Sequence, residues 1–232
     1  MVATQTAERE SSTTYVCLRR GMFLIALLFP LILWLGGGLI FDLPLQTSMS
    51  FYYHTGMRDI FVGVLGTIGT FLFLYRPKSS WENRWLNVAG FSAMGVALFA
   101  MNPLGDCRPP DSDSGLALHG TFAAVFFAAI AVVCGWFPAR HWVLSYLCAG
   151  VMAFCIVVAL VYTFILPLIS LEWKESLCRG NVVFKLEAAA VWAFCAYWLL
   201  KTLEMDQLPL IHRRWRRNTE GAHGPDSGAQ AA

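Results

Sequence analysis

Six apolar segments alternate with short polar connections along the chain. They occupy residues 21–41, 60–75, 85–101, 116–137, 142–166 and 182–200. A hydrocarbon core about 30 Å thick needs roughly 20 mostly apolar residues per helical span, and fewer where flanking side chains reach back to the interface. The pattern therefore predicts six membrane spans, of which the second and third extend into their flanks.

Helices are the expected structure of these segments, because none shows the alternation of period two that is typical of a membrane β-barrel. The first segment is longer than the core of a signal peptide and precedes no small-residue cleavage site, so we expect it to be retained. The sequence predicts an all-α fold: a six-helix transmembrane bundle (residues 20–201) between a polar N-terminal segment (1–19) and a basic juxtamembrane and disordered tail (202–232).

Composition agrees with a membrane protein, since 57% of the 232 residues are hydrophobic and 14% are charged. Twelve of the 17 lysines and arginines lie on the side of the two termini, and five lie on the other side. The positive-inside rule then places both termini on the cytoplasmic side of a cell membrane, such as a bacterial inner membrane. The expected partners are membrane lipids, with anionic head groups at the basic tail "HRRWRRN", and nothing indicates nucleic-acid binding.

Two of the seven cysteines, Cys107 and Cys178, fall in predicted outer connections. In an oxidising compartment they can form a disulfide that joins the second outer loop to the third. Two free thiols are the alternative.

Ionisable residues occur near the outer end of each even-numbered predicted helix. Asp59 precedes the second, His119 lies near the start of the fourth and Glu187 near the start of the sixth, while His54 comes five residues before Asp59. Charged groups near a membrane span are costly and tend to be functional. We therefore expect these four residues to form one polar site.

Each of these residues also has a structural interpretation. The helix dipole stabilises a negative charge, such as that of Asp59, at the start of a helix. His119 can hydrogen-bond to a neighbouring helix, and Glu187 can pair with Arg58 or Arg179.

Small residues favour convergence of the helices near this depth. Gly63, Gly66 and Gly69 lie in the second segment, and alanines at four-residue spacing lie in the third. Such positions allow close contact between membrane helices.

The predicted site has two chemical uses. Two imidazoles and two carboxylates can bind zinc or iron with an open position for an activated water. Without a metal, Asp59, His119 and Glu187 can act as acid and base or relay a proton. Ser50, Tyr53 and Arg58 lie in the same stretch and are candidate supporting residues.

The stretch "SMSFYYHTGMRDIFVG" (residues 48–63) resembles a segment of uncharacterised bacterial multi-pass membrane proteins. More distantly, Ser50, His54, Asp59 and His119 resemble the zinc-binding pattern of the CREST superfamily of intramembrane hydrolases and receptors. That resemblance implies a metal-dependent hydrolase, although the group has a core of seven spans and Glu187 stands where it has a histidine pair.

Three functions are compatible with these observations. The first is an enzyme, such as a hydrolase, acting on a lipid-like substrate. The second is a small transporter, channel, or ligand or proton sensor, and the third is a structural subunit of a membrane complex. The predicted spans carry almost no charge below their outer turn, which disfavours a continuous proton path.

Overall fold

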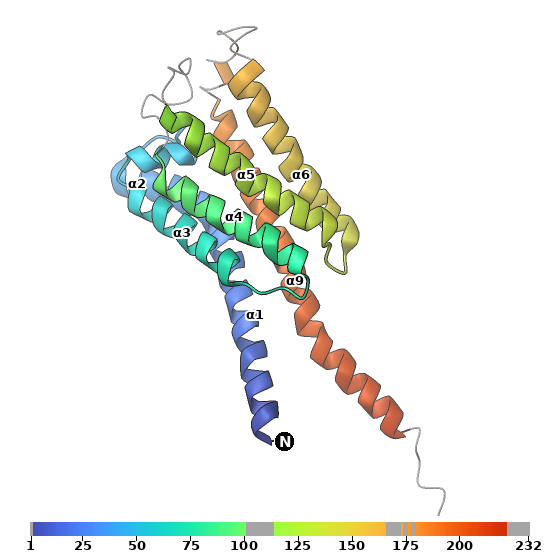
Figure 1. Cartoon of the computed structure of the whole chain (residues 1–232). Coiled ribbons are helices and arrows are strands. Elements are labelled where there is room, and N and C mark those ends of the chain that lie inside the picture. The colour runs from blue at the N-terminus through green and yellow to red at the C-terminus, as the bar shows by residue number, and fades with distance from the viewer. Residues whose placement is uncertain (1, 101–113, 166–172, 174–175, 178–179, 222–232) are drawn as a thin grey trace, which may run out of the picture.

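The computed structural model describes residues 2–100, 114–165, 173, 176–177 and 180–221, and this part of the chain contains helices and connections but no strand. The all-α prediction is confirmed. The elements are α1 (Val2–Leu31), the π-helical turn η1 (Ile32–Gly36), α2 (Gly37–Phe41), the 3₁₀ helix η2 (Ser50–His54), α3 (Arg58–Leu74), α4 (Ser80–Leu98), α5 (Ser114–Trp136), α6 (Trp142–Leu160), the π-helical turn η3 (Val161–Ile165) and α9 (Val182–Gly221) (Figure 1).

Four helical stretches in the described residues are long and apolar enough to cross a membrane: Cys17–Phe41, Leu118–Trp136, Trp142–Leu160 and Val182–Glu204. These confirm a multi-pass membrane protein. The shorter α3 and the more polar α4 are not among them, so the six-span topology stays a prediction.

Within the described residues, six long helices pack as a closed ring in the order α1, α3, α4, α5, α6 and α9, with α9 packing against α1. One end of this ring carries η2 and the start of α9, and we call it the η2 end. The α3–α4 connection lies at the opposite end (Figure 1). We call it the Arg19 end, because Arg19 contacts Tyr75, the residue that follows α3. The largest fully buried side chains include Tyr52, Tyr197 and Trp198.

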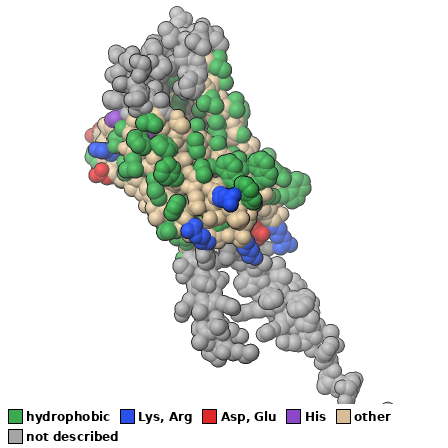
Figure 2. All heavy atoms as spheres, in the orientation of Figure 1, with side chains coloured by type: hydrophobic (Ala, Val, Ile, Leu, Met, Phe, Trp, Pro, Cys, Tyr) green, Lys and Arg blue, Asp and Glu red, His purple; other side chains and the backbone are tan. Residues whose placement is uncertain are grey.

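Apolar side chains cover much of the outer surface of the ring. Leu39, Trp136 and Phe154 are 84%, 75% and 64% exposed. Figure 2 shows hydrophobic side chains across the flank, with Lys and Arg gathered near one end. A surface of this kind suits contact with lipid rather than with water.

Close backbone contact occurs where α3 crosses α4. A Cβ atom built on Gly69 would lie 2.8 Å from the carbonyl oxygen of Gly90, and one built on Gly90 would lie 2.6 Å from that of Gly69. The prediction of a small-residue contact is thus confirmed at Gly69. It is wrong at Gly63 and Gly66, where an added Cβ would meet nothing within 4 Å.

The first long helix has a local irregularity that α9 helps to stabilise. Pro30 lies inside α1 and lacks a backbone N–H, and the π-helical turn η1 follows directly. The indole Nε1 of Trp192 in α9 donates a hydrogen bond of 3.2 Å to the Leu27 carbonyl oxygen. The Leu27 carbonyl, next to the Ala26 carbonyl that Pro30 leaves without its N–H partner, therefore accepts a hydrogen bond from a neighbouring helix.

Candidate functional site

The loop of residues 42–49 is fastened to the beginning of α9. Asn181 has a left-handed backbone (φ 53°), and its Nδ2 donates to the carbonyl oxygens of Leu45 at 2.8 Å and Gln46 at 3.0 Å. The backbone N–H of Phe184 donates to the Thr47 carbonyl oxygen at 2.9 Å. These contacts hold the loop against the η2 end of α9.

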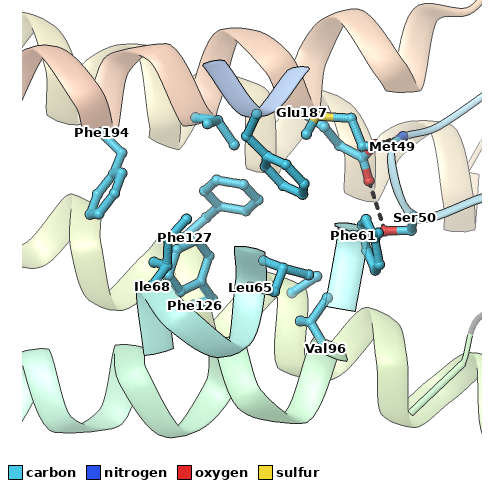
Figure 3. A pocket seen from close by; sticks show the side chains of 13 residues that line it. Met49, Ser50, Phe61, Leu65, Ile68, Val96, Phe126, Phe127, Glu187 and Phe194 are labelled. Carbon is cyan, nitrogen blue, oxygen red and sulfur yellow. Dashed lines mark hydrogen bonds between the residues drawn. The ribbon is translucent and has the colours of Figure 1, made fainter. Parts of the chain in front are cut away.

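Glu187, one turn further along α9, contacts the start of η2. Its Oε2 accepts a hydrogen bond of 2.5 Å from the backbone N–H of Met49, and its Oε1 accepts one of 3.4 Å from the Ser50 hydroxyl (Figure 3). Met49 is the residue before η2. The carboxylate therefore satisfies a free N–H at the start of a short helix, where a negative charge is also favoured.

Glu187 and Ser50 form the polar end of a cavity inside the ring. The cavity has a volume of about 40 Å³, which is enough for up to about three water molecules. Helices α1, α3, α4, α5 and α9 contribute its walls (Figure 3). The other lining residues are apolar: Phe29, Met49, Phe61, Leu65, Ile68, Val96, Ala123, Phe126, Phe127, Val191 and Phe194.

His119 connects α5 to the end of α4. Its Nδ1 lies 2.7 Å from the carbonyl oxygen of Phe99, and the imidazole is 4% exposed. Because a carbonyl only accepts, Nδ1 carries the proton, and the buried Nε2 makes no hydrogen bond to the residues that the structure describes. The structural interpretation of His119, a hydrogen bond to a neighbouring helix, is confirmed.

The remaining predicted residues lie at the surface of the η2 end. Asp59 is exposed in the first turn of α3, and His54 is exposed at the end of η2. The Arg58 guanidinium donates a 3.0 Å hydrogen bond to the Tyr53 hydroxyl and lies 4.6 Å from the centre of the Tyr53 ring. Arg58 and Tyr53 thus form a pair of their own.

Of the predicted residues, the structure brings together Glu187 with Ser50. Within the described residues, no three His, Cys, Asp or Glu side chains form a group that could hold a metal ion. The four-residue site and its zinc or iron therefore stay a prediction. Cys107 and Cys178 lie outside the described residues, so their disulfide also stays a prediction.

Burial also affects Tyr52, which lies in η2 outside the spans. The residue is fully buried, and its ring contacts Phe184. Burial raises the pKa of the phenol, and the backbone of Gln46 acts in the opposite direction.

Sequence reasoning missed an ionic cluster at the Arg19 end, formed by Arg19, Glu82, Lys201 and Glu204. Arg19 is 7% exposed and Glu82 is 8% exposed. Lys201 Nζ lies 3.4 Å from Glu82 Oε1, and Glu204 Oε2 accepts a 3.4 Å hydrogen bond from the backbone N–H of Arg140. The sequence signal is two acidic residues, Glu82 and Glu204, in flanking segments that are otherwise basic. The positive-inside argument uses the arginines and lysines of these segments only to assign topology.

One face of α9 connects the two ends of the ring. Glu187, Val191, Phe194, Trp198 and Lys201 follow one another at spacings of four and three residues, which places them on one side of a helix. The face thus has a carboxylate at the η2 end, apolar side chains in the middle and an ammonium group at the Arg19 end.

No protein-family model, curated protein or solved structure matches the chain. The resemblances noted in the sequence therefore stay predictions, and function has to be argued from the site.

Proposed function

We propose that this chain is a six-span membrane protein, with both termini in the cytoplasm, that binds a small and mainly apolar ligand in the cavity beside Glu187. The distribution of lysine and arginine supports this orientation, which turns the η2 end outward. Packing of α3 and α4 in one ring with the four apolar helices supports six spans. The observation that carries the proposal is an apolar cavity with a carboxylate and a hydroxyl at one end.

Binding is favoured over hydrolysis by the contacts of the candidate catalytic groups. A hydrolase needs an acid, a base and a reacting centre within hydrogen-bond reach of one another. Glu187 contacts the start of η2, His119 contacts the end of α4, and Asp59 is exposed. The cavity itself is lined by one carboxylate and one hydroxyl, which suits recognition of a ligand.

A ligand sensor is favoured over a transporter by the middle of the ring. Phe194, which lines the cavity, packs against Trp198 further along α9, with ring centres 6.1 Å apart, and Trp198 is fully buried. A transported solute would have to displace these side chains, whereas a sensor only needs the outer cavity.

Cavity filling tests the proposal. Ethanol, a neutral probe with three heavy atoms, is titrated into detergent-solubilised protein and followed by saturation-transfer NMR. We expect binding to the unmodified protein and its loss in Ala123→Phe, which fills the cavity. The matched control is Ala128→Phe on the exposed side of α5. Equal saturation transfer in all three proteins would show that ethanol does not enter this cavity and would overturn the proposal.

A further inference from the structure

Aromatic rings make up much of the cavity wall. Phe29, Phe61, Phe126, Phe127 and Phe194 all line it, and they come from α1, α3, α5 and α9. Among the described lining residues Glu187 is the ionisable one, and none is Lys, Arg or His. The described part of the wall therefore combines five π-systems with a carboxylate, and no lysine, arginine or histidine belongs to it.

The rings pack in two groups, one of Phe29 with Phe61 and one of Phe126 with Phe127 and Phe194. Phe29 and Phe61 have ring centres 5.8 Å apart, and those of Phe126 and Phe194 are 6.1 Å apart. Figure 3 shows ring side chains from both sides of the cavity, with Glu187 and Ser50 toward one end. A small occupant would thus meet aromatic surface on several sides and a carboxylate at its head.

The faces of aromatic rings carry partial negative charge and attract cations, an arrangement that proteins use to bind ammonium groups. A carboxylate in surroundings of low dielectric constant adds a stronger attraction for the same charge. An anion would be repelled by the charge of Glu187 and by the ring faces. A neutral alcohol would gain only one hydrogen bond.

We propose that the ligand of this cavity is a small organic ammonium ion, and this inference rests on the proposed function. The ammonium group lies between Glu187 and the phenylalanine rings, and its alkyl part contacts Leu65, Ile68 and Val191. The cavity volume of about 40 Å³ limits the part that enters without rearrangement to a few heavy atoms. Such a group belongs either to a free amine or to the head group of an ethanolamine lipid.

Ethylammonium and ethanol form a matched pair for the test, because both have three heavy atoms and differ in charge. We expect ethylammonium to bind the unmodified protein at least about tenfold more tightly than ethanol. Glu187→Gln should remove this preference, since the amide can still accept from the Met49 N–H but carries no charge. Asp59→Asn, which removes an exposed carboxylate at the same end outside the cavity, should retain it.

Each result is decisive. Equal affinity for ethanol and ethylammonium, with both lost in Ala123→Phe, would overturn the ammonium inference and leave the proposed function standing. Binding of neither probe would overturn both. A preference lost equally in Asp59→Asn would show a general surface charge effect and overturn the inference. Nanodiscs with and without phosphatidylethanolamine then distinguish the two sources, because a lipid head group in the site would weaken ethylammonium binding and a free-amine site would not respond.

Discussion

Arg19 in α1 and Lys201 in α9 are 182 positions apart in the chain, yet Arg19 Nη1 donates a hydrogen bond of 2.8 Å to the Lys201 carbonyl oxygen. The same guanidinium lies 4.8 Å from the centre of the Tyr75 ring and 5.8 Å from that of Trp198. The contact therefore joins the first and last long helices of the ring.

Arg19→Met should lower the free energy of unfolding by about 3 kcal/mol, because it removes one charge from a buried ionic cluster. Arg19→Lys should recover part of this loss, since an ammonium keeps the charge but not the planar contacts with Tyr75 and Trp198. Titration with SDS in mixed micelles measures the change. The control is Arg84→Met at an exposed position of α4, expected within about 0.5 kcal/mol of the unmodified protein. Equal stability of Arg19→Met and the control would contradict the cluster's role.

Gly69→Ala and Gly90→Ala should each destabilise the protein by about 1–3 kcal/mol, because the added methyl group would lie within 3 Å of the facing backbone. Gly63→Ala and Gly66→Ala are controls on the same helix. Their added methyl groups enter open space, so these variants should be neutral or up to about 1 kcal/mol more stable. The same SDS titration compares all four, and an equal effect at the four positions would show that α3 does not approach α4 at Gly69.

Tyr52→Phe should change the pH dependence of stability at alkaline pH. Because burial raises the folded-state pKa of Tyr52, the neutral phenol contributes stability that is fully present below its unfolded pKa of about 10. That contribution is lost as pH rises through the folded pKa. Tyr52→Phe should therefore lose less stability than the unmodified protein above pH about 10. The difference in absorbance near 295 nm between the two proteins should titrate above pH about 10, and a lower midpoint would contradict this prediction.

Asn181→Gly and Asn181→Ala separate the two roles of Asn181. Both lose the hydrogen bonds to Leu45 and Gln46, at a cost of about 1–2 kcal/mol. Asn181→Ala should lose about 1 kcal/mol more, because alanine tolerates the left-handed backbone less well than glycine. Identical unfolding free energies for the two variants would argue against a left-handed residue 181.

Elemental analysis of the purified protein, and of the variants His119→Ala and Glu187→Ala, tests the hypothesis of a bound metal. One zinc or iron per chain, lost in both variants, is the result that the hypothesis requires. The separate contacts of Glu187 with Met49 and of His119 with Phe99 lead us to expect no metal that depends on both residues.

The apolar segments predicted the helical bundle because the length and composition of a membrane helix are local properties of the chain. Glu187 was identified as a candidate because a carboxylate among apolar residues is costly in a span. Its partner is a backbone N–H at Met49, and backbone contacts 138 positions away leave no mark in the sequence. Asp59 also carries a carboxylate at the same predicted depth, but the helix turns it to the surface. Depth along a helix can thus be read from the sequence, whereas the direction of a side chain around the helix depends on packing.

The single helix α9 carries both Glu187 and Lys201, about 21 Å apart at 1.5 Å per residue. A continuous helix resists bending over that length, so we expect a shift of α9 along its axis at Glu187 to move Lys201 relative to Glu82 as well. The contact with Met49 at the η2 end and the ion pair at the Arg19 end are thus held at a fixed spacing by one rigid element.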